Sequence, residues 1–284
     1  DLRSRFMTEN LVIRHRVVDS IRNSLNSLGF LEVETPMLMK SMPEGARDFL
    51  VPSRAFPGEF YALPQSPQIY KQIIQVAGLD RYYQFARCFR DEDTRNDRQL
   101  VHTQMDLEMS FVEEGDVFNV IESTLETLFQ EILGQKIQVP FERMCYDDAI
   151  RRFGTDKPDL RFSLELIDLD PFFKGTTHPA IAGALEGKGR VAGIAVPGGS
   201  CFSRKEIDGF SEFVKTYRAD GAFYLKCTDD GFSSGATKLV PESLRKGLWD
   251  HCKVQSGDLL FFIAGDQTTV SDALGHLRNE VARA

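Results

Sequence analysis

Residues 82–111, YYQFARCFRDEDTRNDRQLVHTQMDLEMSF, carry the clearest structural signal in the sequence. Two segments of this stretch, Tyr82 to Arg90 and His102 to Phe111, have the composition and patterning of strands. The residues between them, Asp91 to Val101, are mostly charged. This arrangement predicts a long antiparallel hairpin with a charged tip.

The second predicted strand alternates between two kinds of side chain. Since successive side chains of a strand point to opposite faces, one face carries Thr103, Met105, Leu107, Met109 and Phe111, and the other carries His102, Gln104, Asp106, Glu108 and Ser110. We expect the apolar face to pack on a core. The polar face is then directed to solvent or to a ligand.

Arg90 ends the first predicted strand and is followed by Asp91, Glu92 and Asp93. The planar, bidentate guanidinium of an arginine held on a sheet suits a phosphate, and carboxylates nearby can hold a metal ion or an ammonium group. The same residues fit a solvated hairpin with surface ion pairs. The pattern alone favours the solvated hairpin and leaves ligand binding open as the alternative.

The remaining segments predict an α+β protein of two domains. Around the hairpin we expect helices at 9–28, from Ser66-Pro67 onward and at 117–133, strands at 30–34 and 60–63, and a polar loop at 40–48. Further on we expect strands at 191–196, 222–225 and 259–264 and helices at 204–217, 241–251 and 270–284. The change of character near Phe162 predicts domains at 1–161 and 162–284.

Composition bounds the function. The chain has 284 residues, 42% of them hydrophobic and 27% charged, which is typical of soluble globular proteins. No apolar run approaches the roughly 20 residues of a membrane span, so no membrane role is expected. A net charge of −8 argues against a general nucleic-acid coat but leaves a local RNA contact open. The five cysteines, odd in number and without a C-x-x-C, favour a reducing compartment and no structural metal site.

Several motifs, in order along the chain, resemble one enzyme family. GFLEVETP at 29–36 resembles motif 1 of the class II aminoacyl-tRNA synthetases, and FRDE at 89–92 with TQMDLE at 103–108 resembles motif 2. Three further stretches are similar to bacterial and organellar aspartyl-tRNA synthetases: PEGARD at 43–48, LPQSPQ at 63–68, and GTDKPDLR at 154–161, which leads into their inserted GAD domain. The resemblance implies a class II antiparallel sheet with flanking helices, incomplete here, followed by a GAD-like α+β domain.

The resemblance also implies a pocket for aspartate. Glu44 is expected to meet the substrate ammonium, and Gln104 and Asp106 to hold it. The side chains expected to line the pocket are those of Ser66, Gln68 and Lys71, with Lys71 taking the side-chain carboxylate of aspartate. A fixed cation at that position suits the rejection of asparagine.

On the nucleotide side, the resemblance implies that Arg90 grips the α-phosphate of ATP and the aspartate carboxylate, and that Glu92 lies near the adenine or the tRNA end. The family has a Phe that stacks on adenine in a Pro-Glu-Phe-Thr-Gln run. Here that run reads Leu-Val-His-Thr-Gln at 100–104, so His102 takes the place of the Phe. A histidine ring can stack but offers less apolar area. No residue is assigned to a metal.

The resemblance runs from Asp1 to the end of the sequence, just past the GAD-like region, without motif 3 and without an N-terminal OB-fold anticodon domain. We therefore expect an aspartate–tRNA ligase family protein that is inactive or incomplete as this chain alone, and that uses ATP, Mg²⁺ and tRNA(Asp) if it is active. The alternative is a non-catalytic paralogue, a structural or RNA-associated subunit of a complex. In both cases a homodimer or a larger assembly is expected to cover the incomplete sheet, in the cytoplasm or in an organelle.

Overall fold

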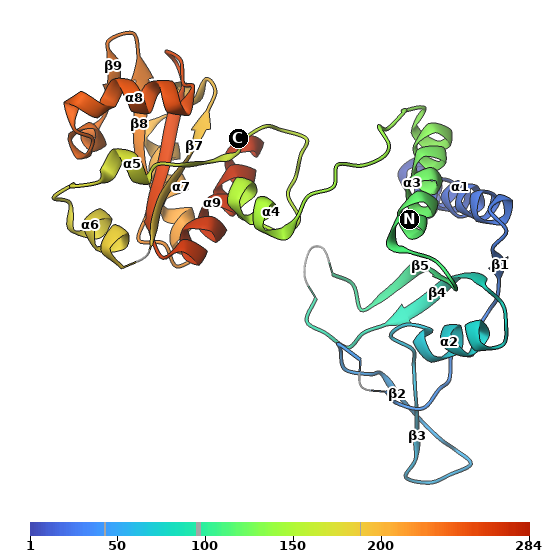
Figure 1. Cartoon of the computed structure of the whole chain (residues 1–284). Coiled ribbons are helices and arrows are strands. Elements are labelled where there is room, and N and C mark those ends of the chain that lie inside the picture. Colours follow the sequence, from blue (N-terminus) through green and yellow to red (C-terminus); the bar gives the residue numbers. More distant parts are fainter. Residues whose placement is uncertain (43, 95–97, 188) are drawn as a thin grey trace. The chain divides into compact units, whose positions relative to one another are not determined.

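The computed structural model describes residues 1–42, 44–94, 98–187 and 189–284. Pro43, which opens the predicted motif 43–48, and residues 95–97 of the predicted hairpin tip lie outside the described residues. The chain divides into two compact units, unit 1 at Asp1–Glu142 and unit 2 at Arg143–Ala284 (Figure 1). In the described part of the chain, no helix is long and apolar enough to cross a membrane.

The predicted hairpin is the centre of unit 1. Strands β4 (Arg81–Phe89) and β5 (Val101–Met109) pair antiparallel, from Arg81 opposite Met109 to Phe89 opposite Val101. A short strand β1 (Leu31–Glu32) joins β4 in parallel and completes a three-stranded sheet of order β1-β4-β5. The hairpin prediction is confirmed.

One face of the hairpin packs on the helices α1 (Arg5–Ser27) and α3 (Glu114–Leu133). Met105, Leu107 and Met109 lie against a buried cluster to which α1 contributes Leu25 and α3 contributes Val120. The predicted alternation therefore holds along the strand. It is wrong at Phe111, whose side chain is 98% exposed. The strand ends at Met109, and Phe111 adopts a left-handed backbone with φ 57° that turns the chain away from the sheet.

The helices begin earlier than the apolar periodicity predicts, because capping side chains set their starts. Ser4 caps α1 by accepting a hydrogen bond from the Met7 N–H. Glu113 and Asp116 form a reciprocal capping box at the start of α3. The ends agree with the prediction: Gly29 and Gly134 follow the two helices with φ of 80° and 65°, conformations that glycine adopts without strain.

Shorter elements bring the remaining motifs to the hairpin. Strands β2 (Leu50–Pro52) and β3 (Phe60–Ala62) form an antiparallel pair, and helix α2 (Gln68–Val76) begins directly after Pro67. The segment between β3 and α2 is held at the end of β4, since the Phe89 N–H donates to the Pro64 carbonyl at 2.9 Å. Motif 63–68 therefore lies beside the hairpin.

Unit 2 is an α+β unit built on a five-stranded sheet of order β6-β7-β10-β8-β9, in which every neighbouring pair is antiparallel. Its strands are β6 (Leu166–Asp168), β7 (Arg190–Val196), β8 (Phe223–Thr228), β9 (Gly231–Ser233) and β10 (Leu259–Gly265). Its α-helices are α4 (Tyr146–Phe153), α5 (Asp170–Phe173), α6 (Pro179–Glu186), α7 (Arg204–Lys215), α8 (Glu242–Cys252) and α9 (Gln267–Arg283), with 3₁₀ turns η1 (Gly199–Cys201) and η2 (Gly235–Leu239).

The sheet of unit 2 is buried on both faces. The central strand β10 sends Leu259, Phe261 and Ile263 into a cluster with α7 and α9. Leu260 and Phe262 point into a second cluster with α5, α6 and α8. Because both faces of β10 are covered, the strand is a continuous apolar run rather than an alternating one.

The units divide at 142/143, earlier than the predicted boundary at 161/162. Helix α4 packs on α9, and Gly154 at its end lies so close that an added Cβ would be 2.0 Å from the Ser271 carbonyl oxygen. Arg278 of α9, fully buried, donates to the carbonyls of Leu164 and Asp159 at 2.7 and 2.8 Å. These contacts tie residues 146–164 to unit 2, and no periodic sequence pattern marks them.

Candidate active site

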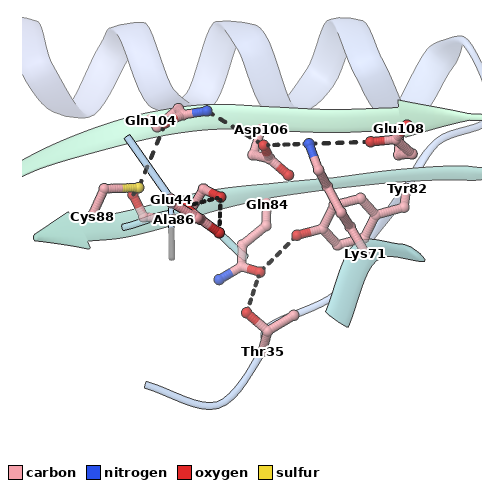
Figure 2. Close-up of polar contacts among 11 residues, drawn as sticks. Thr35, Glu44, Lys71, Tyr82, Gln84, Ala86, Cys88, Gln104, Asp106 and Glu108 are labelled. Carbon is pink, nitrogen blue, oxygen red and sulfur yellow. Dashed lines mark hydrogen bonds and ion pairs between the residues drawn. The ribbon is translucent and has the colours of Figure 1, made fainter. Parts of the chain in front are cut away.

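The polar face of the hairpin meets α2 and the segment 44–48 (Figure 2). Register places Tyr82, Gln84, Ala86 and Cys88 of β4 directly opposite Glu108, Asp106, Gln104 and His102 of β5. Alternate side chains of both strands therefore share one surface, opposite the face that packs on α1 and α3.

A lysine and two carboxylates form the floor of this site. The Lys71 Nζ lies 3.0 Å from Asp106 Oδ1 and 3.1 Å from Glu108 Oε2. The side chains of Lys71 and Asp106 are 13% and 3% exposed. Burial disfavours the charged amine, but the hydrogen bonds and charges of the two carboxylates outweigh it and raise the pKa of Lys71. The ammonium is therefore fixed and fully charged.

Only one of the two carboxylate oxygens of Asp106 accepts hydrogen bonds from the described residues. Its Oδ1 accepts from Lys71 and, at 3.3 Å, from Gln104 Nε2. Its Oδ2 is buried and has no hydrogen-bond partner among the described residues. Burial raises the pKa of the Asp106 carboxyl, while the bond from Lys71 acts in the opposite direction. Since a buried acceptor without a donor is costly, Oδ2 is suited to a ligand that brings a donor.

Gln104 is oriented by both of its neighbours. Its Nε2 faces Asp106, and its Oε1 accepts from the Cys88 thiol at 3.6 Å. Burial raises the pKa of Cys88, which keeps the thiol protonated and able to donate, although the Arg90 charge opposes this shift. In this arrangement the Gln104 oxygen, the atom that could accept from an ammonium, is directed at Cys88.

The opposite wall of the site comes from the 44–48 segment and from residues before α2. The Ser66 hydroxyl donates to the Glu44 carboxylate, at 3.2 Å to Oε2 and 3.4 Å to Oε1. Gln68 is the first residue of α2, and Lys71 follows three positions later on the same side of the helix. The residues predicted for aspartate binding thus come from the 44–48 segment, from Ser66 and the adjoining helix α2, and from strand β5.

The nucleotide-side residues lie at the end of the hairpin where the chain passes from β4 to β5. Arg90 follows β4, is half-buried, and donates its backbone N–H to the Leu100 carbonyl at 2.8 Å. Glu92 pairs with Arg98 at 3.0 Å. His102 is half-buried on β5, opposite Cys88. The predicted phosphate and adenine residues therefore share one end of the sheet.

Five residues of the site received no role from the sequence: Gln65, Tyr82, Gln84, Cys88 and Glu108. The Gln84 Oε1 accepts from the Tyr82 and Thr35 hydroxyls at 2.8 and 2.9 Å, which ties the end of motif 1 to the floor of the site. Strand register is the signal that could have found four of them, because it places them beside or opposite the predicted residues. The described residues contain no group of three or more histidine, cysteine, aspartate or glutamate side chains able to hold a metal ion.

Residues 1–264 match the family described as tRNA synthetases class II (D, K and N). The chain belongs to this family. The resemblance of the hairpin and of the GFLEVETP segment to class II motifs is thereby confirmed, and the antiparallel pair β4–β5 with helices on one face agrees with a fragment of a class II synthetase fold.

Three relatives of this chain share the name aspartate–tRNA(Asp/Asn) ligase. The protein of a Geobacillus species is 49% identical over 284 residues, which cover 100% of this chain and 48% of the relative. That of Oleidesulfovibrio alaskensis is 50% identical over 282 residues, or 99% and 46% of the two chains. That of Caldanaerobacter subterraneus is 46% identical over 283 residues, or 100% and 48%.

The chain spans about half the length of the curated relatives it matches. Their names are those of ligases, and the comparisons give no support to the alternative of a non-catalytic paralogue. The similarity covers both units, so the site residues of unit 1 lie within a sequence that is aspartate–tRNA ligase-like throughout.

Proposed function

We propose that unit 1 forms the aspartate-binding part, and a portion of the ATP-binding part, of an aspartate–tRNA ligase active site, and that residues 162–284 form its GAD-like insertion. The observation that carries the proposal is the Lys71 ammonium, fixed at 3.0 Å from a carboxylate whose second oxygen is buried without a hydrogen-bond partner among the described residues. One cation and one unsatisfied anion side by side complement an amino acid that has an ammonium and a side-chain carboxylate.

Aspartate fits these charges in one orientation. Its ammonium is directed to Asp106 Oδ2 and to the Glu44 carboxylate, and its side-chain carboxylate to Lys71. Asparagine presents an uncharged amide to the same ammonium, so the ion pair with Lys71 is lost. A charged pair that is desolvated in this way discriminates more strongly than the shape of a pocket.

Arg90 and His102 are proposed to serve ATP. The Arg90 guanidinium neutralises the α-phosphate while the aspartate α-carboxylate attacks it and pyrophosphate leaves, so catalysis consists of positioning and of charge neutralisation. His102 stacks on the adenine, and Glu92, now paired with Arg98, lies near the adenine or the tRNA end. The ligase reaction uses Mg²⁺, which would supply charge neutralisation at the phosphates of ATP.

The proposed partners are tRNA(Asp) and a second copy of the chain or a larger assembly. Exposed apolar side chains on α1 support an assembly: Phe6, Leu11 and Val12 are 71%, 54% and 51% exposed. Patches of this kind mark interaction surfaces. The cysteines of the described residues are all free, which supports a reducing compartment, in the cytoplasm or an organelle.

Calorimetry with aspartate, asparagine and a non-hydrolysable aspartyl-adenylate analogue tests the function. The chain should bind aspartate and the analogue but not asparagine. Lys71→Met should lose aspartate binding, because it removes the cation and keeps the length of the side chain. Binding of asparagine as tight as that of aspartate, or undiminished aspartate binding by Lys71→Met, would contradict the proposal.

A further inference from the structure

Gln65 uses its whole amide on one short segment. The Oε1 accepts from the Ala46 N–H at 3.0 Å, and the Nε2 donates to the Ala46 carbonyl at 2.7 Å and to Asp48 Oδ1 at 2.6 Å. The residue is 5% exposed. The amide of Gln65 donates to and accepts from the backbone of the same residue, as a neighbouring strand would, and glutamine is one of the two residue types whose side chain carries an amide.

Asp48 connects this contact to the beginning of the same loop. Its Oδ2 accepts from the Ser41 hydroxyl at 2.6 Å and from the Met42 N–H at 3.3 Å, while Oδ1 accepts from Gln65. Burial alone would raise the pKa of Asp48, but these hydrogen bonds lower it. The ionised carboxylate therefore joins residues 41–42 to residue 48, and Gln65 holds the junction.

The residues that follow Gln65 and Ala46 in the chain both contact the active site. Ser66, directly after Gln65, donates to Glu44, and Arg47, directly after Ala46, accepts through its carbonyl from the Asp91 N–H at 3.0 Å. Residues 46–48 thus alternate between Gln65 and the end of the hairpin next to Arg90. Gln65 is therefore adjacent in the chain to the residue that contacts the Glu44 carboxylate.

We propose that Gln65 is a positioning residue of the amino-acid pocket: its amide fixes the backbone at Ala46 and Asp48, and thereby sets where Glu44 meets the ligand ammonium. Gln65 contacts no ligand itself. The inference rests on the proposed function of the pocket, but its structural part can be measured without a ligand.

Three variants separate the contacts. Gln65→Leu removes all of them. Gln65→Glu keeps an acceptor for the Ala46 N–H but loses the donor and sets two carboxylates against each other. Adding Asp48→Asn to Gln65→Glu restores one bond with donor and acceptor exchanged, since the asparagine amide can donate to Glu and its oxygen can still accept from Ser41 and Met42.

Amide hydrogen exchange at Ala46 gives the ligand-independent readout. Exchange should be about tenfold faster in Gln65→Leu than in wild type, as expected when a buried hydrogen bond is lost, while the amides of β4 stay unchanged. Calorimetry gives the second readout: affinity for the aspartyl-adenylate analogue should fall about tenfold in Gln65→Glu and recover to within about threefold in the double variant.

The outcomes are distinct. Unchanged Ala46 exchange in Gln65→Leu overturns the inference. Faster exchange in Gln65→Leu together with unchanged analogue affinity in Gln65→Glu also overturns it. The Gln65 amide would then hold the segment without positioning the pocket. A wild-type chain that binds no analogue overturns the proposed function instead, and the role of Gln65 in fixing the segment is then decided by Ala46 exchange alone.

Discussion

At the scale of single residues, Lys71 links stability to function. The ammonium compensates a buried carboxylate at 3.0 Å, so Lys71→Met leaves Asp106 charged and unpaired. We expect the free energy of unfolding to fall by about 3 kcal/mol at neutral pH, the cost of breaking a buried pair from one side. Adding Asp106→Asn should recover most of this loss. Urea unfolding of the two variants measures both effects, and an equal loss in the double variant would contradict the pairing.

The pH dependence of the same pair has a definite sign. The folded-state pKa of Lys71 is raised above its ordinary value of 10.5. A raised amine pKa adds stability that is complete below the unfolded value and disappears as pH rises through the folded value. The stability difference between wild type and Lys71→Met should therefore be constant from pH 8 to about pH 10 and shrink above it. A difference that grows above pH 10 would be inconsistent with a charged Lys71.

His102 is the residue where the proposed adenine contact is weakest. The ring is half-buried on β5. It is smaller than the phenylalanine that the aspartyl-tRNA synthetases have at this position. His102→Phe should bind the aspartyl-adenylate analogue roughly three- to tenfold more tightly, the range expected from a better aromatic contact. Aspartate alone should bind equally well to both proteins, which makes it the control. Calorimetry decides, and a parallel gain for aspartate would point to an indirect effect.

At the scale of elements, sequence patterns predicted the parts that follow periodic rules. In the hairpin and in the five longest described α-helices, apolar residues recur with a period of about 2 or 3.6, and this pattern is visible in the sequence. Periodicity did not predict the helix starts set by the caps Ser4 and Glu113, or the early end of the alternation at the left-handed Phe111. Each of these features depends on a single residue, and a single residue leaves no periodic pattern.

The sequence predicted those residues of the site that lie in motifs with a role implied by the resemblance. Glu44, Ser66, Lys71 and Asp106 were named from resemblance, and the structure brings them together. Gln65 was quoted within a motif but received no role. Its bonds go to backbone and carboxylate groups 17 and 19 residues earlier, and such contacts leave no spacing pattern.

The packing of α4 on α9 makes a prediction of its own. Gly154 has φ 72°, and an added Cβ would lie 2.0 Å from the Ser271 carbonyl oxygen. Gly198, with φ 68° and nothing within 4 Å, is the matched control. Gly198→Ala should cost about 1 kcal/mol for the left-handed backbone, and Gly154→Ala about 3 kcal/mol or more because backbone must also move. Equal losses in denaturant unfolding would show that α4 yields without strain.

At the scale of the whole molecule, the two units bury their sheets unequally. Unit 2 has a core cluster on each face of its five-stranded sheet. In unit 1 the described core cluster lies on one face of a three-stranded sheet, and α1 exposes Phe6 and Leu11. Because apolar burial is the main source of folding stability, unit 1 should unfold first.

The position of the single tryptophan makes this order measurable. Trp249 is the only tryptophan of the chain, and it packs on Phe232 within unit 2. Its fluorescence therefore reports unit 2, whereas far-UV circular dichroism reports the helices of both units. During urea unfolding, part of the dichroism should be lost at a concentration about 1 M or more below the fluorescence midpoint. Coincident transitions would mean that the two units unfold as one cooperative system, and the expected order of unfolding would be wrong.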